Sequence, residues 1–110
     1  MNRYCLTLDL VDDPQLIAEY EAWHRNVWPE ILASITGSGI EQLEIYRVAN
    51  RLFMIMETND GFSFAAKGAA DAANPKVQEW ETLMWKYQQA LPGAKPGEKW
   101  MLMEKIFSLK

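Results

Sequence analysis

The sequence has few of the side chains that hold metals or form cross-links. It contains one cysteine, Cys5, and one histidine, His24, among 110 residues. A single cysteine cannot form an internal disulfide, and the N-terminus lacks an apolar leader, so we expect a reducing, cytoplasmic environment. One histidine and one distant cysteine do not make a zinc site, and no carboxylates cluster at ligand-like spacing. We therefore expect neither a metal nor a cofactor.

Basic stretches, long apolar runs and Gly-rich phosphate-binding loops are also missing. The formal net charge is −4, and without a lysine or arginine cluster we expect no nucleic-acid partner. No segment approaches the roughly 20 apolar residues of a membrane-spanning helix, so we expect no membrane partner. Any chemistry should depend on ordinary side chains alone.

Apolar side chains, by contrast, are abundant. They make up 49% of the sequence, enough for a core that needs no disulfide or metal. The length fits one domain over residues 1–110, and we find no linker, repeat or low-complexity segment.

The order of predicted elements indicates an α+β fold. A helix is expected from Pro14, with a break before Pro29 and a second piece that ends at Gly37, because proline disfavours helical geometry in the preceding residue. Another helix is expected from Pro75 to Leu91 at helical spacing of its apolar residues. Residues 62–73 form a short helix or loop. Strands are predicted at residues 3–10, 40–48, 51–57 and 99–107.

This β-α-β-β-α-β order is typical of the ferredoxin-like fold, in which the helices cover one face of the sheet. The other face would then expose apolar side chains. Because exposed patches of that kind usually mark an interface, we expect a homodimer that packs sheet to sheet as a dimeric α/β barrel.

The segment from Tyr20 to Glu30 holds the residues best suited to chemistry. Histidine is the side chain whose ordinary pKa lies nearest neutrality, and Tyr20 precedes His24 by four residues, so both rings lie on one helix face. A hydroxyl and an imidazole aimed at the same space can form a small polar site. The alternative is ordinary packing with satisfied polar tips. Trp28 is expected near His24 because of the break before Pro29.

The same residues resemble the signature of the L-rhamnose mutarotase family. The resemblance rests on Tyr20-x-x-x-His24 followed by Val27-Trp28-Pro29-Glu30, on Ile45-Tyr46, on Asn50-Arg51-Leu52-Phe53, and on Gln78-x-Trp80 with Met84. It implies a dimeric α/β barrel that interconverts the α and β anomers of a 6-deoxy-L-sugar. It also implies that His24 is the proton donor and that Tyr20 and Trp80 bind the sugar.

Two positions depart from the family pattern. Glu81 stands where the family has a second tryptophan, and Leu43 stands where it has a pocket tyrosine, while the later Tyr46 is kept. Since the Tyr20–His24 pair remains, we expect the same reaction on L-fucose or L-rhamnose, with Glu81 or a water in the complementary proton-transfer role. We also expect substrate-binding residues beyond Tyr20 and Trp80, namely Trp28, Tyr46 and Glu81.

Two other classes of function remain open. Cofactor-free monooxygenases of the dimeric α/β-barrel type use a histidine in an apolar pocket, and oxygen consumption with an aromatic substrate would identify one. A non-catalytic sugar-binding module would bind the sugar without accelerating exchange of its anomers.

Overall fold

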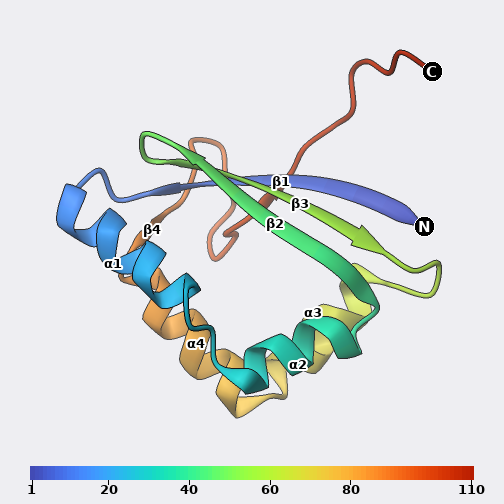
Figure 1. Ribbon diagram of the computed structural model, residues 1–110, viewed down its shortest axis with the longest axis horizontal. Coiled ribbons are helices and arrows are strands. Elements are labelled where there is room, and N and C mark those ends of the chain that lie inside the picture. The colour runs from blue at the N-terminus through green and yellow to red at the C-terminus, as the bar shows by residue number, and fades with distance from the viewer.

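A curved antiparallel sheet lies over four helices in the computed structural model, which describes residues 1–110 (Figure 1). The sheet is built from β1 (Asn2–Leu10), β2 (Ile40–Val48) and β3 (Arg51–Thr58), in the order β2-β3-β1. Two short strands, β4 (Gln88–Gln89) and β5 (Met101–Leu102), both pair with the remaining edge of β1. The predicted α+β, ferredoxin-like class is confirmed.

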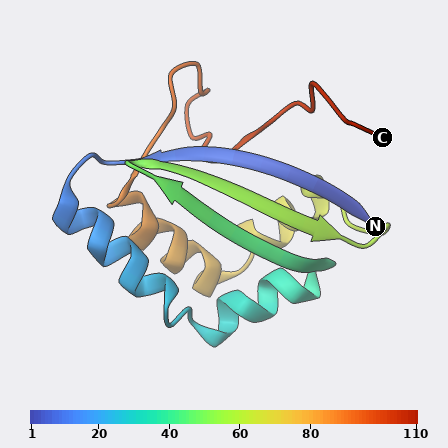
Figure 2. The same ribbon diagram turned by 45° about the horizontal axis from the view of Figure 1, so that its top comes forward.

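All four helices lie on the same side of the sheet (Figure 2). They are α1 (Pro14–His24), α2 (Pro29–Gly37), α3 (Phe64–Ala72) and α4 (Pro75–Trp85). None of them is long and apolar enough to cross a membrane.

The predicted helix starts and the break at Pro29 are confirmed. Asp13 accepts hydrogen bonds from the backbone N–H groups of Gln15 and Leu16, and Asn74 accepts from those of Lys76 and Val77. Such caps satisfy donors that have no partner within the helix.

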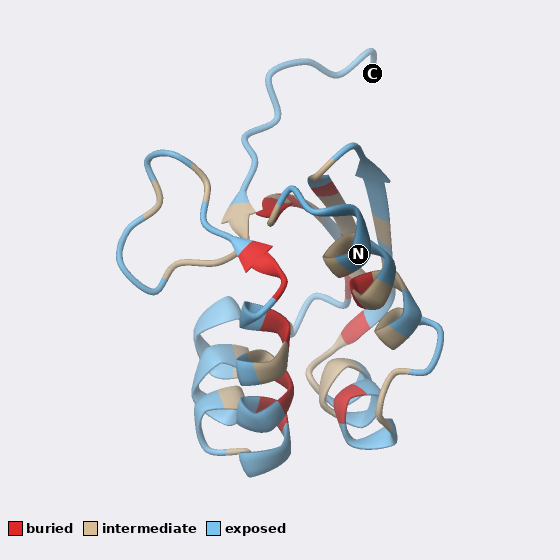
Figure 3. Cartoon of the chain, turned by 90° about the vertical axis from the view of Figure 1, so that its left-hand side faces the viewer, coloured by how far each residue is buried: buried red, intermediate tan, exposed pale blue.

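The core lies between the inner face of the sheet and the helices. Alternation along β1 sends Leu6, Leu8 and Leu10 toward the helices, and all three are buried. From the helix side α4 contributes a buried stripe of Val77, Trp80 and Met84 (Figure 3). This arrangement places Trp80 of α4 opposite the inner face of the sheet, on the side where the predicted site residues lie.

The helix predicted to reach Leu91 is shorter, and this boundary was wrong. The α4 helix ends at Trp85 because the chain then turns to the open edge of β1. The backbone N–H of Val11 donates to the carbonyl of Tyr87 at 2.8 Å, and Gln88 pairs with Leu10. Sheet hydrogen bonds thus replace helical ones.

The last strand, predicted over residues 99–107, is confined to Met101–Leu102. One further backbone bond joins the N–H of Met103 to the carbonyl of Cys5 at 2.7 Å. After it the chain leaves the sheet on the side opposite the helices (Figure 1). We call residues 104–110 the C-terminal tail. Three of its apolar side chains are almost wholly exposed: Ile106 at 93%, Phe107 at 75% and Leu109 at 86%.

The outer face of the sheet is less apolar than predicted. Cys5, Phe53 and Ile55 are half-buried at its centre. Ion pairs stand toward its two ends, Arg51–Asp9 at 2.8 Å and Arg3–Glu57 at 3.7 Å. The methionines of β3, Met54 and Met56, point to the helix side instead, because they alternate with Phe53 and Ile55.

Candidate active site

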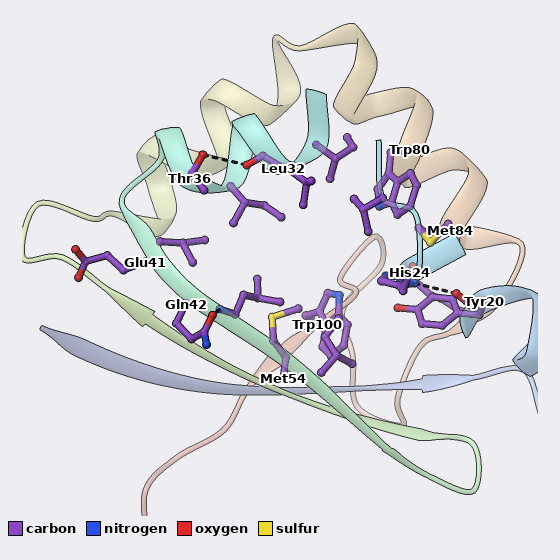
Figure 4. Close-up of a pocket in the computed structure, with 17 residues that line it drawn as sticks. Tyr20, His24, Leu32, Thr36, Glu41, Gln42, Met54, Trp80, Met84 and Trp100 are labelled. Carbon is purple, nitrogen blue, oxygen red and sulfur yellow. Dashed lines mark hydrogen bonds between the residues drawn. The ribbon is translucent and has the colours of Figure 1, made fainter. Parts of the chain in front are cut away.

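A cavity of about 550 Å³ lies between the inner face of the sheet and the helices (Figure 4). This volume is in the range of small-molecule sites, and most of the lining is apolar. Figure 4 shows Tyr20, His24 and Trp80 together at one end, and Thr36, Glu41 and Gln42 at the other. The apolar walls come from α2, α4 and the sheet: Ile31, Ile35, Leu43, Ile45, Met54, Met84 and Trp100.

His24 is the last residue of α1, and its ring is fixed by the preceding turn. The Nδ1 atom lies 2.9 Å from the backbone carbonyl oxygen of Tyr20. Because a carbonyl oxygen only accepts hydrogen bonds, we assign the Nδ1 position a proton that it donates. The other ring nitrogen, Nε2, is therefore the one that can exchange a proton with a ligand.

Tyr20 lies beside this imidazole, with ring centroids 4.4 Å apart. The predicted shared face of the two rings is confirmed. Tyr20 is only 4% exposed, and burial raises its pKa to about 12, while a side-chain hydrogen bond with Gln88 acts in the opposite direction. Burial has this effect because a phenolate loses the solvation that water gives it. Near neutral pH Tyr20 is thus an uncharged hydrogen-bond donor.

Trp80 forms an aromatic wall next to the pair. Its ring is 5.7 Å from that of His24, nearly edge to face. The ring centroids of Trp28 and Trp23 lie 5.1 Å and 6.3 Å from that of Trp80. Trp80 packs against both His24 and Trp28, and Trp28 is not among the residues that line the cavity. The structure makes Trp28 a support for Trp80.

Tyr46 and Glu81 border neighbouring hollows. Tyr46 is 53% exposed on β2 and shares a second hollow with Tyr20 and His24. Glu81 lines a third hollow with Lys67, Asp71 and Lys99. It is not among the residues that line the cavity around His24, although Trp80 lines both spaces.

The third hollow, which we call the charged hollow, is lined mostly by apolar residues but also carries Lys67, Asp71, Glu81 and Lys99. Lys67 and Asp71 form a largely buried ion pair at 2.9 Å. Partial burial lowers the pKa of Lys99, and the charge of Glu81 acts against that effect. The Nζ of Lys99 donates to the backbone carbonyl of Glu81 at 3.1 Å. These contacts place Lys99 and Glu81 side by side at this hollow.

Two of the cavity residues that sequence reasoning missed are Gln88 and Trp100. Gln88 is 7% exposed and lines both the His24 cavity and the charged hollow. The sequence pattern placed Gln88 in a helix, and a helix did not predict that its side chain points into the cavity. Trp100 lines both as well. Alternation with Met101 was the available signal for Trp100, but it did not say that this side of the strand faces a cavity.

The fold and the site define a class of protein: a small α+β chain whose sheet and helices border a cavity of about 550 Å³ with an imidazole and a phenol at one end. Comparison with known proteins narrows this class. The family model described as L-rhamnose mutarotase matches residues 3–109. The chain therefore belongs to the L-rhamnose mutarotase family, whose members are carbohydrate isomerases.

One relative is an L-fucose mutarotase of Xanthomonas campestris pv. campestris, 52% identical over 111 residues that cover 99% of this chain and 89% of that protein. The structure is also similar to a crystal structure of an L-rhamnose mutarotase from Formosa agariphila, with TM-score 0.73, 19% identity and full coverage of both chains. Tetracenomycin F2 cyclase from Streptomyces glaucescens has TM-score 0.64 and 16% identity, and covers 100% of this chain and 98% of that one. At 19% and 16% identity, the two structures support the fold assignment and not a function.

Proposed function

We propose that the protein is a mutarotase that interconverts the α and β anomers of a 6-deoxy-L-hexose, with L-fucose as the preferred substrate. The observation that carries the proposal is the pairing of a held imidazole with a protonated phenol at one end of a cavity with mostly apolar walls. The named activity of the Xanthomonas relative at 52% identity supports L-fucose over L-rhamnose.

The reaction opens the pyranose ring, turns the aldehyde and closes the ring on its other face. Opening needs a proton delivered to the ring oxygen and one removed from the anomeric hydroxyl. We assign the delivery to Nε2 of His24 in its imidazolium form, which takes the proton back when the ring closes. A positioned acid or base of this kind contributes a factor of about 10²–10⁴.

Tyr20 and the aromatic walls would orient the sugar. The neutral phenol of Tyr20 donates a hydrogen bond to a sugar oxygen and does not compete for the transferred proton. The ring of Trp80 offers a face to the C–H groups of the pyranose, and the apolar walls formed by α2 and β2 suit the 6-methyl group. Tyr46, at the edge of the second hollow, would contact the sugar only from outside the cavity.

The complementary removal of a proton is assigned to a water molecule. Glu81 was the other candidate from the sequence, but its carboxylate borders the charged hollow, where Gln78 Nε2 donates to it at 3.3 Å.

The test is anomeric exchange of L-fucose and L-rhamnose, measured by saturation-transfer NMR. Wild type should accelerate exchange, and His24→Ala should reduce kcat/KM by about 10²–10⁴. Glu79→Gln, an exposed change on α4, is the control and should keep the wild-type rate. Exchange at the buffer rate with both sugars would contradict the proposal, and saturable sugar binding without exchange would favour a non-catalytic binding module.

The molecule should act as a homodimer. The C-terminal tail projects from the sheet side that no helix covers, and Ile106, Phe107 and Leu109 have almost no contact with their own chain. Phe53 and Ile55 give that same side a partly apolar centre. A second copy packed sheet to sheet would cover both surfaces at once.

Light scattering tests the dimer. Wild type should have twice the mass of one chain, and removal of residues 104–110 should shift it toward the monomer. Lys105→Ser, a polar change within the same tail, should leave the mass unchanged. A monomeric wild type would contradict the dimer.

We place the enzyme in a reducing compartment such as the cytoplasm, since Cys5 is a free thiol.

A further inference from the structure

Gln88 is a buried amide that the reaction described above does not use. It lies on β4 at the wall shared by the His24 cavity and the charged hollow. It is 7% exposed, and its carbonyl oxygen Oε1 is fully buried with no hydrogen-bond partner in the chain. Buried polar atoms in proteins are nearly always paired, so an unpaired one that borders a cavity points to a ligand.

Tyr87, the residue before Gln88, has hydrogen-bond partners within the chain for its buried hydroxyl group. Tyr87 is 2% exposed, and its hydroxyl accepts from Trp23 Nε1 at 3.1 Å and donates to Glu19 at 3.1 Å. Both hydrogen-bonding functions of Tyr87 are thus satisfied within the chain. Gln88, one residue further along, has no such network, and its side chain only acts to lower the pKa of the neighbouring Tyr20.

The backbone of Gln88 is joined to the edge of β1 by sheet pairing. Gln88 pairs with Leu10 of β1, and the preceding carbonyl, that of Tyr87, accepts from the N–H of Val11. A side chain that starts from a strand is placed more reproducibly than one on a loop. The last torsion of a glutamine is soft, so its amide can turn toward a ligand while the Cα stays in place.

We propose that Gln88 is a substrate-binding residue whose amide hydrogen-bonds one ring hydroxyl of the sugar and so discriminates between L-fucose and L-rhamnose. This inference rests on the proposed mutarotase function and deepens it. The two sugars differ only in the configuration of the hydroxyls at C2 and C4. An amide held beside Tyr20 can accept a hydrogen bond from one of these hydroxyls in one configuration and not in the other.

The experiment compares Gln88→Met with Gln89→Met. Methionine matches glutamine in length and cannot replace the amide. Gln89 is the next residue of the same strand and is exposed, so it is the matched control. Anomeric exchange is measured for L-fucose, L-rhamnose, 2-deoxy-L-fucose and 4-deoxy-L-fucose, and the thermal midpoint of each variant is checked against wild type.

Loss of one hydrogen bond should lower kcat/KM for L-fucose about ten-fold in Gln88→Met, with L-rhamnose reduced less, and leave Gln89→Met at the wild-type value. For one of the two deoxy sugars, wild type and Gln88→Met should then be equal, because the hydroxyl that Gln88 binds is gone. A merely structural role would lower all four sugars alike.

Two results would overturn the inference in distinguishable ways. If wild type accelerates L-fucose exchange but Gln88→Met and Gln89→Met behave alike, or if all four sugars fall together, Gln88 does not bind the sugar and the mutarotase function stands. If wild type accelerates exchange of neither L-fucose nor L-rhamnose, the proposed function fails, and the role of Gln88 fails with it.

Discussion

Tyr20→Phe separates the ionisation of the buried phenol from its packing. Burial raises the pKa of Tyr20 from 10.0 to about 12. Above pH 10 the unfolded chain releases this proton while the folded protein retains it, so stability is complete below pH 10 and is lost as the pH rises toward 12. The loss from this one group is about 1.4 kcal/mol at about pH 11 and about 2.7 kcal/mol well above pH 12.

Urea unfolding of wild type and Tyr20→Phe, at about pH 8 and about pH 11, measures this effect. The difference between the two proteins removes the contribution of every other titrating group. Wild type should lose about 1.4 kcal/mol more than the variant, a relative shift of roughly 1 M in the urea midpoint. At neutral pH the variant should itself be less stable by about 1 kcal/mol, because Gln88 loses its partner.

Tyr46→Phe is the matched control, since it removes an exposed hydroxyl from a neighbouring tyrosine. It should follow the pH response of wild type. An identical pH response of wild type and Tyr20→Phe would refute the reasoning, because Tyr20 would then ionise in the folded protein as it does in the unfolded chain. The assignment of Tyr20 as a donor that keeps its proton would lose its physical basis.

Two further predictions concern the walls of the site. Trp80→Ala should lower the free energy of unfolding by about 3–5 kcal/mol, because Trp80 is buried among His24, Trp23 and Trp28; denaturation that shows a cost below about 1 kcal/mol would contradict this packing. Glu81→Gln should change kcat/KM for L-fucose by less than about two-fold, and a loss of about 100-fold in the exchange assay would restore Glu81 as the base.

Local patterns predicted most of the fold. Two features were sufficient for α1: the Asp13-Pro14 start and the break before Pro29. Alternation was sufficient for β1 and β2, since each has a face toward the core. The proximity of Tyr20 and His24 followed from their spacing of four on one helix. In each case the decisive interaction lies within a few residues along the chain.

What the sequence did not reveal depends on contacts between distant segments. The apolar spacing of Met84, Tyr87 and Leu91 is helical, yet the open edge of β1 captures residues 88–89, because unpaired sheet edges bind extended chain. For this reason the sequence pattern did not predict that Gln88 lies on a strand beside the cavity. Likewise, nothing local to Trp28 and Glu81 indicates that Trp80 packs against both Trp28 and His24, or that Glu81 borders a hollow with Lys67 and Lys99.

The divided fourth strand gives the two sides of the molecule unequal mechanical strength. The β1–β3 ladder is continuous from Asn2–Thr58 to Asp9–Arg51, whereas β4 and β5 each pair with β1 at two positions. Gln88 and Trp100, which close one side of the cavity, are attached through those short strands and the loop between them. We expect this side to open locally more readily than the main ladder, because fewer pairs hold it. Amides of β4 and β5 should therefore exchange with solvent far faster than those of β3, and a bound sugar should slow them first.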